Sequence, residues 1–277
     1  MKKFIVAFDG LRFSESVKEY SVTLAKKSSA HLVGVFLDDT LRSSYKVYDL
    51  ISKGNFEARQ RELEEKDKVT RNLAAELFEN ACRDQGLNYS VHRDRNVALQ
   101  ELLNESIYAD LLILDNSETM TVYSEKIPSE FVRDLLSLVE CPVLIVPHQF
   151  EPVDRLVLLY DGDPSSVFAI KMFSYALASL KQLPTEVVTV REFDENSYVP
   201  NSRLMKEFMQ RHFPHATYTV LNGQPDYTIA DYLKTLTGYP LVVLGAYRRG
   251  LVSRWFRPSM ADALMKDLHL PLFIAHG

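Results

Sequence analysis

The sequence has little that would indicate a secreted, membrane-spanning or disulfide-stabilised protein. Its 277 residues include two cysteines, Cys82 and Cys141, which form no CxxC pair and no disulfide framework. We interpret both as free thiols in a reducing compartment. The apolar run Phe4–Phe8 is too short for a signal peptide, and no run approaches the ~20 residues of a membrane span. These absences predict a cytoplasmic protein with no membrane partner.

A surplus of positive charge is also missing. The net charge is −5, which argues against a general nucleic-acid binder but leaves room for a local basic site. Zinc-ligand spacing, a nucleophile elbow and a P-loop are absent as well. His212 and His215 flank Pro214, which ends a helix between them, and no third ligand follows. The sequence therefore predicts no metal site and no catalytic residues.

What the sequence does contain is an alternation of apolar strands and amphipathic helices. The continuous apolar run Phe4–Phe8 ends at Asp9, which is typical of a strand buried on both faces. Ser14 is the expected N-cap of the next helix. The core face of that helix is predicted to hold Val17, Tyr20, Leu24 and Ala25. A longer helix is expected from Phe56 to Arg83, with a charged first half and a core face at Leu73, Leu77, Phe78 and Ala81.

The same pattern starts again near residue 150. Asp161-Gly162 follows the run Leu156–Tyr160 as Asp9-Gly10 follows Phe4–Phe8, 152 positions earlier. Pro258-Ser259 likewise repeats Pro128-Ser129, 130 positions earlier. The first copy therefore carries about 22 extra residues, placed most simply between Leu37 and Arg83. We predict two tandem α/β domains, 1–149 and 150–277, each with five parallel strands and helices on both faces.

One stretch of the second copy has the composition of an anion site. Leu241–Ser259 begins as a buried strand, breaks at Gly245 and ends where a helix opens at Pro258. The loop between them carries four arginines: Arg248, Arg249, Arg254 and Arg257. A strand end, clustered positive charge and a helix N-terminus together favour a bound phosphate. In parallel sheets, ligands bind at the carboxyl ends of strands, where Asp9, Asp115, Asp161 and Gly245 are all expected.

This arrangement resembles the universal stress protein family in its tandem form, over essentially the whole chain. The resemblance rests on the Asp-Gly after the first strand of each copy and on the pattern after the fourth strand. Nucleotide-binding members of that family have G-x2-G-x9-G-[ST] there. Gly245 matches the first glycine and Ser259 the final Ser/Thr, whereas Arg248 and Pro258 replace the other two glycines and Gly250 lies two positions late. In the first copy Asp115, Glu118 and Pro128 replace the glycines, and Ser129 is retained.

The resemblance implies a Rossmann-like fold and a nucleotide site in the second copy. An adenine nucleotide such as ATP, or another phosphate ligand, would be held there by eight residues: Asp161, Gly162, Val190, Gly245, Arg248, Gly250, Arg257 and Ser259. Asp161 would face the adenosine. Arginine forks would partly replace backbone N–H groups as phosphate donors. In the first copy, Asp115 and Glu118 place negative charge where a polyphosphate would sit.

The resemblance also implies how the copies associate. The last strands, Pro142–Val146 and Pro271–Ala275, would meet across a pseudo-twofold axis and form an intramolecular pseudo-dimer. A homodimer of the whole chain and an unidentified protein partner are further expectations.

Three functions stay open on the sequence. The first is a non-catalytic stress-response protein that binds a nucleotide in its second copy. The second is a ligand-free interaction or scaffold protein, with the charged helix segment Glu57–Lys68 as its partner surface. The third is a weak ATPase, for which the sequence offers no candidate base.

The same residues also have ordinary structural explanations. Ser129 and Ser259 suit helix N-caps, and Asp9 and Asp161 suit turn caps.

Overall fold

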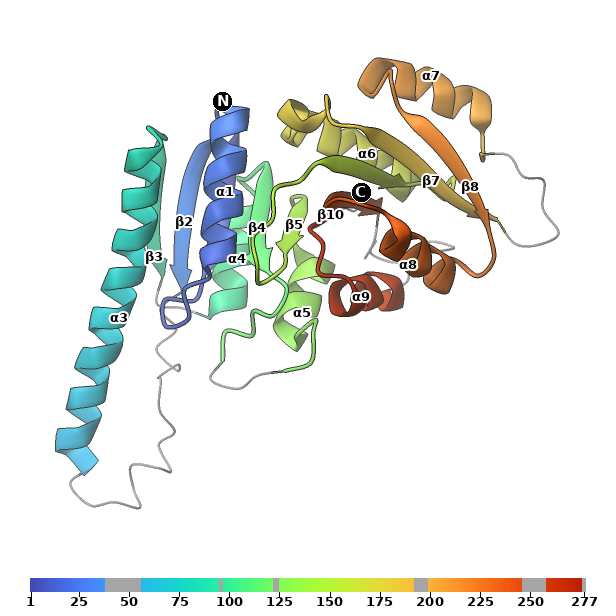
Figure 1. Ribbon diagram of the computed structural model, residues 1–277. Coiled ribbons are helices and arrows are strands. Elements are labelled where there is room, and N and C mark those ends of the chain that lie inside the picture. Colours follow the sequence, from blue (N-terminus) through green and yellow to red (C-terminus); the bar gives the residue numbers. More distant parts are fainter. Residues whose placement is uncertain (38–55, 95–96, 122–124, 192–198, 246–257, 276–277) are drawn as a thin grey trace. The chain divides into compact units, whose positions relative to one another are not determined.

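The chain forms two compact units in the computed structural model, which describes residues 1–37, 56–94, 97–121, 125–191, 199–245 and 258–275 (Figure 1). Met1–Val139 is the first unit and Glu140–Gly277 the second. The sequence repeat places the boundary between its two copies at residues 149 and 150. This boundary differs from that of the compact units and stays a prediction.

The first unit alternates strands and helices as the sequence pattern predicts. Its four strands are parallel in the order β3-β2-β1-β4. The elements are β1 (Lys3–Phe8), α1 (Glu15–Ser28), β2 (His31–Leu37), α3 (Phe56–Asp84), β3 (Tyr89–Asp94), α4 (Ala98–Ser106), β4 (Leu111–Asp115) and α5 (Glu130–Leu138). α1 and α3 pack on each other and on the sheet, and α4 packs against α5. This is the layered arrangement that right-handed βαβ connections produce.

α1 confirms the predicted capping and core face. Ser14 has extended backbone angles, and its hydroxyl accepts a hydrogen bond from the Val17 N–H at 3.3 Å. All four residues of the predicted face are buried. The burial of that face fixes α1 on β1, β2 and β4.

α3 has the predicted extent but a different core face. Phe78 is fully buried as expected, whereas Leu73 and Leu77 are 53% and 38% exposed, so their predicted core role is wrong. Ala74 and Cys82, one turn on either side of Phe78, are buried instead. Residues four apart lie in one row along a helix, and the row of Ala74, Phe78 and Cys82 packs on the sheet. Leu73 and Leu77 belong to a neighbouring row and therefore face outward.

The second unit repeats the alternation and adds one strand. Its order is β5-β10-β9-β6-β7-β8, parallel from β10 to β8. The elements are β5 (Val143–Val146), β6 (Arg155–Leu159), α6 (Pro164–Ala176), β7 (Thr185–Arg191), α7 (Ser202–His212), β8 (Thr217–Asn222), α8 (Pro225–Thr235), β9 (Pro240–Gly245), α9 (Pro258–Asp267) and β10 (Leu272–Ala275). α6 packs on β9 and β10, and α8 packs beside α9 (Figure 1).

β5 is the one antiparallel strand among the described pairings of this sheet. It pairs with β10, with Ile145 opposite Leu272 and Val143 opposite Ile274. The last strands of the two sequence copies therefore meet, and all their residues are buried. This pairing explains why the second compact unit begins at Glu140, ahead of the boundary between the sequence copies. The wider pseudo-dimer of the two copies stays a prediction.

Candidate functional site

The carboxyl ends of three neighbouring strands bring four of the predicted site residues together. β6 lies between β7 and β9, with Leu159 opposite Val188 and Leu158 opposite Val243. Two residues further along, this register places Asp161 level with Val190, and Gly245 ends the adjoining strand. Gly162 follows Asp161 with a φ of 91°. The strand register thus assembles the site edge that the sequence predicted.

Asp161 has a structural role in the turn after β6. It is 8% exposed, and its Oδ1 accepts a hydrogen bond from the Asp163 N–H at 2.9 Å. The equivalent Asp9 in the first unit makes the same bond, from the Leu11 N–H at 2.9 Å. Carboxylate side chains that accept a bond two residues on form Asx turns. Both aspartates therefore cap turns. The two copies are alike in this turn, and their sites differ at other positions.

Gly245 is required by the packing of α6. A Cβ atom at this position would lie 2.4 Å from both the carbonyl carbon and the carbonyl oxygen of Ser165, and 2.8 Å from the Ser166 nitrogen. These are backbone atoms of the first turn of α6, which cannot rotate away as a side-chain end would. Glycine therefore lets the end of β9 touch the N-terminus of α6, a role that the sequence pattern did not reveal.

Ser165 is a functional candidate that the sequence reasoning missed. It stands in the first turn of α6 and is 4% exposed. Within the described part of the chain, its Oγ has no hydrogen-bond partner. A buried hydroxyl without a partner costs roughly 1–3 kcal/mol, and the helix N-terminus beside it carries a partial positive charge. Asp163, the N-cap residue, contributes no side-chain cap bond. The group most favoured next to Ser165 is therefore an anion or another acceptor.

The remaining predicted site residues are only partly described. Arg248, Gly250 and Arg257 lie outside the described residues. α9 begins at Pro258, and Ser259 is its second residue. The side chain of Ser259 lies outside the described residues, so its interpretation as an N-cap stays a prediction. A helix that begins with proline places the missing N–H at a position that needs no intrahelical partner.

The first unit has a carboxylate at the corresponding strand end. Asp115 ends β4, is 5% exposed and accepts hydrogen bonds at both of its carboxylate oxygens. Ser14 Oγ donates to Oδ2 at 2.9 Å, and the Ser117 N–H and Oγ donate to Oδ1 at 2.8 and 2.6 Å. Ser14 caps α1 as described above. The first unit thus holds its own anion beside the helix N-terminus, where the second unit has Gly245.

Glu118 binds backbone N–H groups in the loop that follows β4. Its Oε1 accepts hydrogen bonds from the N–H groups of Thr119 and Met120, at 3.0 and 2.9 Å. Ser129 donates its hydroxyl to the Glu118 carbonyl oxygen and accepts from the Val132 N–H at 3.1 Å, which makes it the N-cap of α5. The carboxylates therefore take up backbone N–H donors that a phosphate would need.

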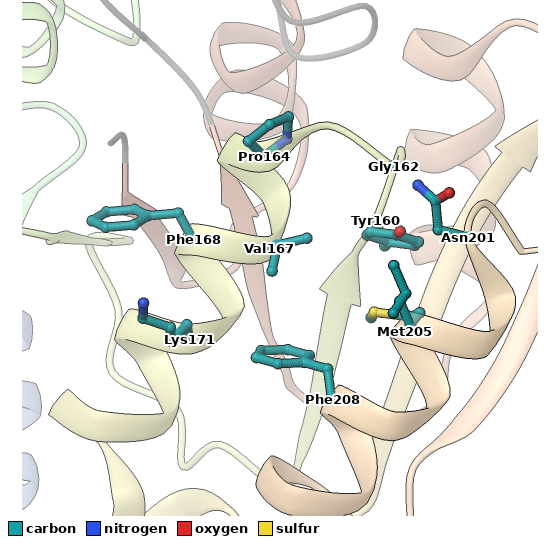
Figure 2. A pocket seen from close by; sticks show the side chains of 10 residues that line it. Tyr160, Gly162, Pro164, Val167, Phe168, Lys171, Asn201, Met205 and Phe208 are labelled. Atoms are coloured by element: carbon teal, nitrogen blue, oxygen red, sulfur yellow. The ribbon is translucent and has the colours of Figure 1, made fainter.

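A pocket of about 450 Å³ opens next to the site edge, between α6 and α7 (Figure 2). Val167 from α6 and Met205 and Phe208 from α7 face it from opposite sides, and Tyr160 lies at its inner end. The Tyr160 hydroxyl donates to the Pro200 carbonyl oxygen at 3.1 Å. Burial raises the pKa of this tyrosine, and the neighbouring Asp161 carboxylate raises it further. Tyr160 is therefore a neutral donor.

The described residues hold no group of three or more His, Cys, Asp or Glu side chains arranged to bind a metal ion. Within the same residues, no helix combines the length and apolar character needed to cross a lipid bilayer.

Comparison with solved structures shows the fold of tandem universal stress proteins. A universal stress protein from Archaeoglobus fulgidus DSM 4304 matches 99% of this chain and 98% of its own, with a TM-score of 0.69 and 14% identity. A functionally unknown protein from Pseudomonas aeruginosa PAO1 matches 100% of this chain and 92% of its own, with a TM-score of 0.62 and 12% identity. A putative universal stress protein from Pseudomonas aeruginosa UCBPP-PA14 matches 100% of this chain and 93% of its own, with a TM-score of 0.59 and 14% identity. No protein-family model and no curated protein matches the sequence. The likeness in fold extends over the whole length of the chain.

Proposed function

We propose that this chain is a tandem universal stress protein: a cytoplasmic, non-catalytic stress-response protein whose second unit binds an adenine nucleotide or another phosphate ligand. The observation that carries the proposal is the buried hydroxyl of Ser165, which has no partner among the described residues. The backbone of the same residue packs against Gly245. Asp161 stands at the adenosine end and the start of α6 at the phosphate end.

The contrast between the two units supports the same conclusion. In the first unit, the Asp115 carboxylate receives the Ser14 hydroxyl at the start of α1. In the second unit, the residue at that strand position is Gly245, which brings no charge. In the first unit, the Asp115 carboxylate already occupies the place of a bound anion. In the second unit no side-chain anion stands at that strand position, and the Ser165 hydroxyl is available as a donor to a ligand. Nucleotide binding is therefore proposed for the second unit only.

Equilibrium binding of labelled ATP to four proteins tests this proposal. The wild type should bind saturably. Ser165→Ala and Asp161→Ala should each weaken binding about 10- to 100-fold, as loss of a hydrogen bond to a charged group does. Asp9→Ala is the matched control, because it removes the same turn bond in the first unit. Its affinity should equal that of the wild type.

Two results would contradict the proposal. One is the absence of saturable binding at about 5 mM ATP, a range in which even weak physiological ligands bind. The other is an equal loss of affinity in Asp9→Ala and Asp161→Ala, which would place the ligand in both units or in neither.

A second candidate function, an interaction protein, is favoured by the outer face of α3. Val69, Leu73 and Leu77 follow one another at four-residue spacing and are 58%, 53% and 38% exposed. An apolar row on an exposed helix is a common docking surface for another helix. We propose a second copy of this chain as its occupant. Sedimentation velocity at about 100 µM should detect a dimer, and Leu73→Glu should convert it to a monomer. A monomeric wild type would refute this candidate.

A further inference from the structure

The pocket between α6 and α7 leaves large apolar side chains in contact with solvent. Leu204, on its rim, is 63% exposed, and Phe168 and Phe208 are half-buried. Val167 is also half-buried and faces Phe208 across the hollow (Figure 2). Two helices that only cover a sheet would bury such residues or replace them with polar ones. The exposed apolar surface indicates a site for an apolar group.

The first unit supplies an internal comparison for these positions. Counted from the N-caps Ser14 and Asp163, the α1 residues that correspond to Val167, Phe168 and Lys171 of α6 are Lys18, Glu19 and Val22. On α1, Lys18 forms ion pairs with both Glu15 and Glu19. That is an ordinary ion-paired helix face. On α6 two apolar side chains, Val167 and Phe168, replace Lys18 and Glu19, and a lysine stands where α1 has Val22.

A positive charge, that of Lys171, lies at one end of the pocket. Lys171 lies one turn after Val167 on α6 and lines the pocket. His212, at the end of α7, stacks on Phe208 with ring centroids 4.4 Å apart. Burial lowers the pKa of His212, and the fields of Lys181 and Lys171 lower it further. The cationic field of the lysines therefore reaches this end of the groove, and among the described residues that line the pocket there is no carboxylate.

Other polar groups in the pocket are few. The Tyr160 hydroxyl already donates to Pro200, and Asn201 is the remaining side-chain amide in the lining. A ligand rich in hydrogen-bonding edges, such as a nucleobase, would leave most of them unpaired here. An apolar body with one anionic end fits the lining better, because it leaves the walls dry and meets the ammonium group of Lys171.

We propose that the α6–α7 pocket binds a small amphipathic carboxylate, such as a medium-chain fatty acid. The acyl chain lies between Val167 and Phe208, and the carboxylate lies beside Lys171. The volume of about 450 Å³ is within the range of small-molecule sites. This site does not require a bound nucleotide, because its ligand contacts Val167, Lys171 and Phe208 instead of Ser165 and Gly245. Gly162 lines this pocket and also belongs to the proposed nucleotide site.

Ligand-observed NMR titration of the full chain with octanoate and with neutral 1-octanol tests the proposal. The wild type should bind octanoate saturably and prefer it to 1-octanol by about 3- to 10-fold, the value of a partly exposed ion pair. Lys171→Met should abolish this preference while 1-octanol still binds. Val167→Glu, which introduces a carboxylate at a half-exposed position of the apolar wall, should weaken both ligands at least about tenfold. Lys234→Met on α8 is the charge-matched control and should bind as the wild type does.

Several outcomes would overturn the proposal. Octanoate that fails to saturate by about 10 mM would exclude the site. Equal preference for octanoate in Lys171→Met and the wild type would exclude the assigned cation. Unchanged binding in Val167→Glu, with a thermal transition equal to that of the wild type, would place the ligand elsewhere. A loss of binding in Lys234→Met equal to that in Lys171→Met would show that the effect comes from net charge and not from the position of Lys171.

Discussion

Replacement of Gly245 by alanine gives the sharpest test of how the site edge is built. The new Cβ would lie 2.4 Å from the Ser165 carbonyl carbon and oxygen, whereas ordinary contacts begin near 3.4 Å. Relief of that overlap requires a backbone movement of about 1 Å between β9 and α6, because both sides of the contact are main chain. Overpacking of this kind typically costs about 1–3 kcal/mol. For a unit of this size, the melting temperature should fall by about 3 to 12 °C.

The assay is differential scanning calorimetry of the full chain, with Gly86→Ala as the control. Gly86 also needs glycine for its φ of 65°, but a Cβ there would meet nothing within 4 Å. The control therefore reports the cost of positive φ alone, about 1 kcal/mol, and should shift the transition less than Gly245→Ala does. A Gly245→Ala protein that melts within about 1 °C of the wild type would refute the close approach of strand and helix.

Three further predictions concern titratable side chains. Burial raises the pKa of Glu105, but hydrogen bonds from two basic neighbours outweigh it and lower the pKa overall. The stability that this group contributes is present above its unfolded pKa of about 4.3 and is lost as pH falls through the lower folded value. The stability difference between wild type and Glu105→Gln should therefore shrink from about pH 5 to pH 3 in urea titrations. Cys82 is fully buried, and burial raises the pKa of its thiol to about 12, so Ellman's reagent should modify it only as fast as the unit unfolds. The Tyr232 hydroxyl donates to Glu186 Oε1 at 2.7 Å, and Tyr232→Phe should cost about 1–2 kcal/mol in urea unfolding.

Much of the fold was predictable because its strands are continuous apolar runs that end in turn residues. The repeat in the sequence then predicted the second unit from the first, including the Asp-Gly turns after β1 and β6. The core face of α3 was not predictable in the same way. Several apolar rows run along this helix, and only contact with the sheet decides which one is buried.

The location of the candidate site was predictable, whereas some of the residues that form it were not. Asp161 and Gly245 were found because they follow strands. Ser165 was missed because a serine in a helix start carries no distinctive pattern. Its importance comes from burial beside Gly245, which depends on how α6 crosses β9. The α6–α7 pocket was missed for a related reason: the spacing between two helices is a property of packing and leaves no local mark in the sequence.

The antiparallel pairing of β5 with β10 has a consequence for how the chain can be divided. A fragment cut at the sequence repeat, beginning at residue 150, would lack β5 and leave the hydrogen-bonding edge of Leu272–Ala275 bare on that side. Bare apolar edges recruit strands from other molecules and lead to aggregation. A fragment beginning at Glu140 keeps that edge paired. The compact unit is therefore longer than the unit that repeats, because β5 belongs to the first sequence copy and pairs with the last strand of the second.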